Sequence, residues 1–139
     1  MCWDVTICRF PREIATLAEL PHNFRLSAIA PRMEVTRSLK RLFPDADISD
    51  LSWIVLEGDE FKVEINTGHH EPCDGLTLHV RGSSKALEAV TQIARNFDAR
   101  AFDMTACRFL DRMIDPATGF NQWRTYTRRV ARAAQSIEA

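Results

Sequence analysis

The stretch FKVEINTGHHEPCDGLTLHV, residues 61–80, decides the fold. Residues 61–66 and residues 76–80 both alternate between apolar and polar side chains, which is the pattern of a strand with one buried face. The nine residues between them, 67–75, contain glycine and proline, which mark turns and loops. The stretch therefore predicts a β-hairpin whose two strands are joined by a long loop.

Further strands are predicted on both sides of this hairpin. Residues 2–9, CWDVTICR, alternate cleanly, and residues 52–57, SWIVLE, are rich in the β-branched and aromatic types that favour strands. Residues 99–104, ARAFDM, have the length and composition of a short strand. Together with the hairpin, these segments predict a sheet of about five strands.

Helices are predicted between and after the strands. Apolar residues recur at helical spacing over residues 32–43 and 83–97, and a short helix can form at 12–20. A long C-terminal helix is predicted at about 117–137. Its apolar positions step by three and four residues, which gives one seam made of Phe120, Trp123, Thr127, Val130, Ala134 and Ile137.

The predicted fold is a single α+β domain over residues 1–139, with a mainly antiparallel sheet of about five strands, helices packed on one face and the long C-terminal helix. We expect the seam of that last helix to cover the sheet of its own chain. The alternative is that the seam joins copies of the chain. The oligomeric state expected is therefore a monomer or a weak homodimer.

Composition narrows the class of function. The chain has 139 residues, 45% of them hydrophobic, and a formal net charge of −1, as in ordinary globular proteins. The net charge indicates neither nucleic-acid nor membrane binding, and no apolar segment is long enough to cross a membrane. Four arginines of the predicted C-terminal helix could bind phosphate groups but are interpreted as a solvated helix face; they are Arg124, Arg128, Arg129 and Arg132. Charged residues interrupt the first thirty positions, so no signal segment is recognised and a cytoplasmic location is expected.

The histidine-rich loop suggests a metal site or an active site, formed by His69, His70, Cys73 and His79. Adjacent histidines point apart, however, and His79 lies further along a strand. A closed metal site needs three or four converging ligands. The four cysteines form no CxxC pair and are expected to be reduced thiols. We therefore predict no enzyme activity and no cofactor, with a small ligand- or metal-binding domain or enzyme using this region as the alternative.

The charge distribution is the most unusual feature of the sequence. Residues 44–74 contain nine of the nineteen acidic residues, and Lys62 is the single lysine or arginine among them. Two interpretations explain this pattern. The acidic residues are either simply exposed to solvent at the edge of the domain, or they form a binding surface for a basic protein partner. The partner-binding residues predicted on the second interpretation are Asp45, Asp47, Asp50, Asp59, Glu60, Glu71 and Asp74.

Three fragments carry a family resemblance. They are FKVEINTG…EPCDGLTLHVRG, RAFDMTACRFLD and GFNQWRTYTRRV. Together with the N-terminal WDVTICRF, they resemble a largely uncharacterised family of small bacterial cytosolic proteins that is similar to single-domain immunity proteins. The chain departs from the family's DC-x-TGEF pattern over residues 103–109, where it reads DMTACRF and has Cys107 in place of the glycine.

The resemblance implies a function without catalysis. Immunity proteins are encoded beside secreted antibacterial toxins and neutralise them by binding. The partner expected is therefore a cognate protein toxin that has a basic surface and acts in the cytoplasm, with a nuclease as one candidate. The acidic segment fits this expectation, because an acidic surface can cover a basic cleft.

Overall fold

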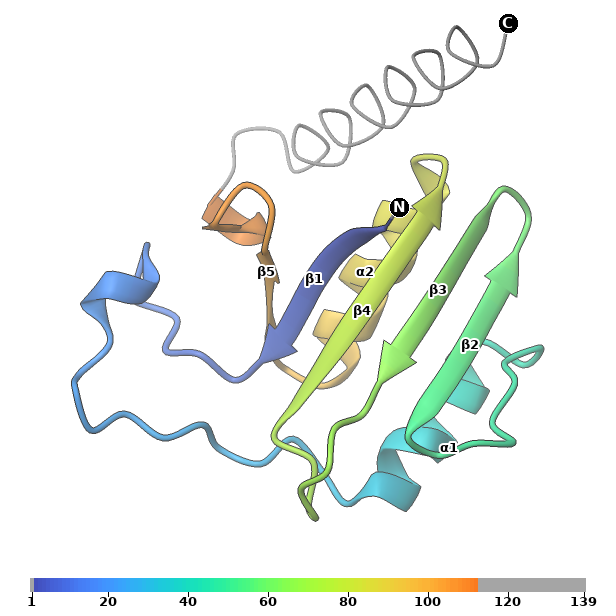
Figure 1. Cartoon of the computed structure of the whole chain (residues 1–139), viewed down its shortest axis with the longest axis horizontal. Coiled ribbons are helices and arrows are strands. Elements are labelled where there is room, and N and C mark those ends of the chain that lie inside the picture. The colour runs from blue at the N-terminus through green and yellow to red at the C-terminus, as the bar shows by residue number, and fades with distance from the viewer. Residues whose placement is uncertain (1, 113–139) are drawn as a thin grey trace, which may run out of the picture.

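The computed structural model describes residues 2–112 of the protein. Its centre is a six-stranded sheet in which every neighbouring pair of strands is antiparallel. The strands lie in the order β2-β3-β4-β1-β5-β6 (Figure 1). Their bounds are Trp3–Cys8 for β1, Trp53–Gly58 for β2, Phe61–Asn66 for β3, Gly75–Gly82 for β4, Arg100–Asp103 for β5 and Arg108–Phe109 for β6.

The hairpin predicted from residues 61–80 is confirmed. Strands β3 and β4 pair in one register, with Val63 opposite Val80 and Ile65 opposite Leu78. These side chains are fully buried, while the alternate residues are partly exposed. The period of two that was visible in the sequence therefore separates a core face from an open face.

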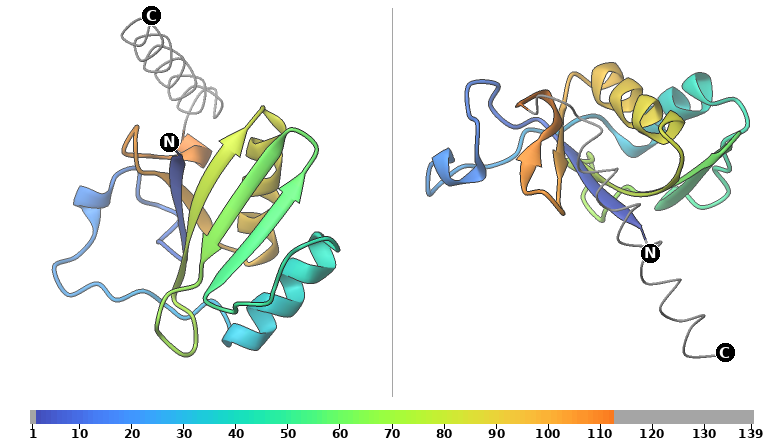
Figure 2. Two further views of the ribbon diagram at one scale, coloured as in Figure 1. Left: turned by 45° about the vertical axis from the view of Figure 1, so that its right-hand side comes forward. Right: turned by 90° about the horizontal axis from the view of Figure 1, so that it is seen from above.

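Two α-helices, Arg32–Leu42 (α1) and Lys85–Asn96 (α2), lie on the same face of the sheet (Figure 2). Helix α2 packs against β3, β4 and β5. Its buried side chains include Val90 and Ile93, and those of α1 include Val35 and Leu39. We call the side of the sheet that carries neither helix the open face.

The predicted architecture of about five strands with a long C-terminal helix is corrected by the structure. The sixth strand, β6, has two residues, which is too short for any alternation to be visible. Its Phe109 is fully buried and packs edge-on against Phe102 of β5, with 5.2 Å between the ring centroids. The predicted helix at 117–137, with its seam, lies outside the described residues.

The segment 12–20 was predicted as a short helix and forms only a 3₁₀ turn, Leu17–Glu19. None of the three residues in the turn is buried, so no apolar face stabilises a longer helix there. The one buried residue of the segment, Ile14, packs against Phe102 and Phe109 instead. None of the helices between residues 2 and 112 combines the length and apolarity needed to cross a membrane.

Candidate functional site

The histidine-rich loop, residues 67–74, is clamped to the start of α1 by Arg32. The guanidinium of Arg32 donates to the carbonyl oxygen of Gly68 at 2.6 Å and to the hydroxyl of Thr67 at 3.3 Å. In return, the carboxylate of Glu71 accepts a hydrogen bond from the backbone N–H of Arg32 at 3.1 Å. That N–H is one of the donors left open at a helix N-terminus. The loop therefore has a structural role that explains much of its polar composition.

The structure does not bring the four residues of the alternative site together. His69 and His70 are exposed on the loop, whereas Cys73 is fully buried and its pKa is raised by that burial. His79 lies on the open face of β4. Over residues 2–112, no group of three or more histidine, cysteine, aspartate or glutamate side chains is arranged to hold a metal ion.

His79 instead belongs to a cluster on the open face. Its Nδ1 lies 2.8 Å from a carboxylate oxygen of Asp4, which faces it from β1. The indole of Trp53 stacks on the imidazole, with 5.4 Å between ring centroids and 22° between the planes. Trp53 is 38% exposed, so this cluster presents an aromatic surface beside polar groups. A surface of this kind can serve as a protein-binding site, because tryptophan is enriched among the residues that contribute most to the binding energy of protein interfaces.

Strand β2 forms one edge of the sheet, and acidic residues surround it. Asp47 forms a β-bridge with Val55 in the middle of the strand, and the carbonyl of Asp50 accepts the N–H of Trp53 at its start. A surface hollow near the end of the strand is lined by both Asp45 and Glu57. The β2–β3 turn adds two more acids. We call this set the acidic edge: Asp45, Asp47, Asp50, Glu57, Asp59 and Glu60.

Two members of the acidic edge also shape the loop before β2. The carboxylate of Asp47 accepts hydrogen bonds from the Ser49 hydroxyl and backbone N–H, and that of Asp50 does the same with Ser52. These bonds stabilise the ionised carboxylates, so the pKa of each aspartate lies below its usual range. Both groups therefore stay negatively charged in mildly acidic solution.

Glu71 and Asp74 do not belong to the acidic edge. They lie in the β3–β4 loop, whereas Asp59 and Glu60 lie in the β2–β3 turn at the opposite end of the hairpin (Figure 1). A six-residue strand separates the two ends, a length of roughly 20 Å at ~3.3 Å per residue. Asp50, just before β2, lies at the same end as Glu71 and Asp74, because β2 begins opposite the end of β3. The predicted partner-binding residues are thus divided between the two ends of the hairpin, and Glu71 also has the structural role described above.

Basic side chains limit the negative potential of the acidic edge at three points. Lys40 of α1 donates to the carbonyl oxygen of Ala46 at 2.8 Å, which places its charge near Asp47. Lys85 lies 4.0 Å from the carboxylate of Glu60. Lys62 of β3 lies opposite Glu57 in the strand pairing and forms an ion pair with Glu64 on the open face. The remaining carboxylates, including those of Asp45 and Asp59, take part in no ion pair within residues 2–112.

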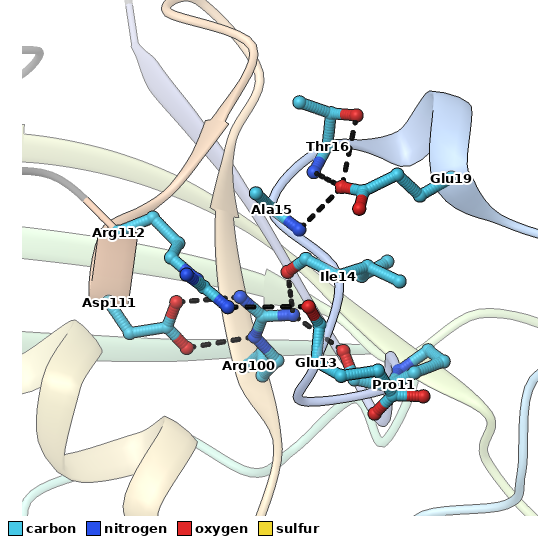
Figure 3. A network of polar contacts seen from close by, with 9 residues as sticks. All are labelled: Pro11, Glu13, Ile14, Ala15, Thr16, Glu19, Arg100, Asp111 and Arg112. Atoms are coloured by element: carbon cyan, nitrogen blue, oxygen red, sulfur yellow. Dashed lines mark hydrogen bonds and ion pairs between the residues drawn. The ribbon is translucent and has the colours of Figure 1, made fainter.

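Arg100 is the centre of a buried polar network that the sequence did not indicate (Figure 3). Its side chain is 1% exposed and stacks over the ring of Phe109. Two of its nitrogens donate to the Asp111 carboxylate, at 2.7 and 2.8 Å, in the paired geometry that favours arginine. A third nitrogen donates to the carbonyl oxygens of Pro11 and Ile14. This guanidinium therefore ties the long segment after β1 to the end of the described chain.

The turn between β5 and β6 is shaped by Asp103. Its carboxylate accepts the backbone N–H groups of Thr105 at 2.8 Å and Ala106 at 3.0 Å. Cys107 follows with a φ of 55°, the left-handed region that glycine adopts most readily. Cys107, the residue at which the chain departs from the glycine of the DC-x-TGEF pattern, therefore occupies a left-handed backbone position.

Comparison with known proteins identifies no relative: no family model, no curated protein and no solved structure matches this chain.

Proposed function

We propose that the protein is a non-catalytic immunity protein that binds a cognate secreted antibacterial toxin in the cytoplasm and neutralises it by occlusion. The observation that carries the proposal is the acidic edge, which gathers six carboxylates along one outer strand of the sheet. The resemblance to immunity proteins supports it from the sequence. A toxin with a basic surface, such as a nuclease cleft, is the matching partner.

Physical reasons link the acidic edge to this role. Complementary charge speeds the encounter of two proteins and disfavours wrong partners. The carboxylates of Asp47 and Asp50 accept hydrogen bonds from Ser49 and Ser52, which fixes the positions of two of the negative charges. Trp53, at the start of the same strand, offers an exposed aromatic anchor. Carboxylates around one apolar anchor are the composition expected of a surface that binds a basic protein.

A purely structural explanation of the acidic edge also exists. Charged residues on an outer strand prevent it from pairing with the edge of another sheet. Under that explanation, a change of charge would promote aggregation and leave recognition of a specific partner unaffected. The two explanations therefore make different predictions for the same variants.

The test compares three tagged proteins in affinity capture from the host, with captured proteins identified by mass spectrometry. They are the wild type, an edge variant with Asp45→Lys and Asp59→Lys, and a control with Glu13→Lys and Glu88→Lys. All four side chains are exposed. None of these four side chains takes part in a hydrogen bond or ion pair within residues 2–112, and Glu13 accepts a hydrogen bond from Arg112 through its backbone carbonyl alone. The edge variant and the control therefore carry the same change in net charge at different places.

We expect one stoichiometric partner with a basic toxin domain, captured by the wild type and the control but not by the edge variant. Purified partner and protein should then form an inactive complex in an assay of the toxin. Failure of the wild type to capture or inhibit any toxin would refute the immunity role. Equal capture by the edge variant and the control would refute the acidic edge as the contact surface.

A further inference from the structure

A cavity of about 310 Å³ lies between α2, β5 and the 3₁₀ turn Leu110–Arg112. It is on the opposite flank of the sheet from β2, because β5 and β6 end the strand order that begins with β2. The volume falls at the lower end of the range found for small-molecule sites. Its lining consists of Arg12, Thr91, Ala94, Arg95, Ala99, Arg100, Ala101, Leu110 and Asp111.

The charge of this lining is predominantly positive. It contains three guanidinium groups and one carboxylate. The carboxylate of Asp111 is held by Arg100 in the network of Figure 3, and Arg12 pairs with Asp98. Arg95 forms no ion pair with any acidic side chain of residues 2–112. Among the described residues, one cation in the lining is therefore left without an acidic partner.

Apart from Thr91, whose hydroxyl donates to the carbonyl oxygen of Leu87, the rest of the lining is apolar. Ala94, Ala99, Ala101 and Leu110 contribute methyl and isobutyl groups, and each is nearly buried in the chain itself. Arg100 forms part of the wall with its guanidinium already bound to Asp111, so that wall is fixed before any ligand arrives. A preformed apolar cavity with one available guanidinium selects for a ligand with one anionic group and a small apolar body.

We propose that this cavity binds a small organic carboxylate. The carboxylate group would lie against Arg95, and the apolar part of the ligand would contact the alanine and leucine side chains of the wall. The site is separate from the acidic edge and does not depend on the immunity role. It assigns the protein a second binding function, for a small molecule.

The test uses benzoate as the probe and follows the backbone amides of Ala94, Ala99 and Ala101 by ¹H–¹⁵N NMR spectroscopy of the full chain. Benzamide, which has nearly the same shape and no charge, is the matched ligand control. Arg95→Gln removes the cation at the cavity, and Arg37→Gln removes an exposed arginine on α1 as the protein control. Ala94→Leu adds volume at the cavity wall and leaves every charge in place.

We expect benzoate to shift the three amides in a saturable way at millimolar concentration. Arg95→Gln should weaken binding about tenfold, the effect of losing one charge-assisted hydrogen bond. Benzamide should bind wild type about as weakly as benzoate binds that variant, Arg37→Gln should change nothing, and Ala94→Leu should abolish the shifts. The proposal is overturned if the shifts do not saturate at tens of millimolar benzoate, if benzamide binds equally well, or if Arg95→Gln retains full affinity.

Discussion

Replacing Arg100 with methionine tests the buried network directly, because methionine keeps the length of the side chain and removes its five donors. The substitution deprives the carbonyl oxygens of Pro11 and Ile14 of their hydrogen bonds, at about 1 kcal/mol each. It also breaks the ion pair with Asp111, whose side chain is 48% exposed. Water can rehydrate that carboxylate, so the pair adds only about 1 kcal/mol. The free energy of unfolding should therefore fall by about 3 kcal/mol.

Urea denaturation followed by tryptophan fluorescence measures this change, and the slope of the transition shows whether the folded state is otherwise intact. Arg12→Met is the matched control. Arg12 also pairs with an aspartate, but the two side chains are 65% and 84% exposed, so its loss should cost under ~0.5 kcal/mol. If Arg100→Met lowered the free energy of unfolding no more than Arg12→Met does, the network would not hold the segment after β1 in place.

Three further predictions follow from individual residues. The hydrogen bonds from Arg100 lower the pKa of Asp111 below its ordinary value of 3.8. The ionised Asp111 therefore contributes its full stabilisation of the folded state above pH 3.8, and this contribution is lost as the pH falls through the lower pKa of the folded state. The difference in free energy of unfolding between wild type and Asp111→Asn should accordingly shrink on acidification below about pH 4, and a constant difference would contradict the ion pair. Burial raises the pKa of Cys8 to about 12, and Cys73 is fully buried. Iodoacetamide at neutral pH should therefore label the exposed Cys107 and leave Cys8 and Cys73 unmodified. Rapid labelling of Cys8 or Cys73 in the folded protein would contradict the packing described. Gly82 has a φ of 120°, and a Cβ atom there would lie 2.1 Å from the carbonyl oxygen of Glu60. Gly82→Ala should therefore lower the free energy of unfolding by about 2 kcal/mol or more. An unchanged urea midpoint would show instead that the β2–β3 turn relaxes to accept the methyl group.

The sequence was most informative where a single periodicity controls which face is buried. Strands β3 and β4 were predicted because Val63, Ile65 and Leu78 alternate with polar residues, and one face of the sheet is covered by helices. The same period cannot appear in β6, which has two residues. Segment 12–20 shows the converse, since its helical composition has no surface on which to pack.

Long-range polar partners could not be predicted from the sequence. An arginine on a short strand is normally expected to be exposed. The burial of Arg100 depends on the carbonyl oxygens of Pro11 and Ile14, nearly ninety residues away in the chain. The pairing of His79 with Asp4 likewise depends on β1 lying beside β4. Nothing local in the sequence signals either arrangement.

The predicted acidic surface was divided by the same kind of long-range geometry. The excess of acidic residues over 44–74 was visible in the sequence. Strand β3, in the middle of that segment, runs from one end of the hairpin to the other and so separates the acidic residues before it from those after it. Six acids therefore surround β2, whereas Glu71 and Asp74 lie in the β3–β4 loop, at the end of the hairpin opposite Asp59 and Glu60. Glu57, which was not among the predicted contact residues, lies within the acidic edge.

The central claim is that the acidic edge recognises a basic protein toxin. The most direct measurement is the dissociation constant of the purified toxin for the Asp45→Lys/Asp59→Lys variant, compared with the Glu13→Lys/Glu88→Lys control under identical salt conditions. Because like charges facing each other across an interface cost several kcal/mol, we predict that the edge variant binds at least about 100-fold more weakly, while the control binds like the wild type. Equal dissociation constants for the two variants would contradict the claim.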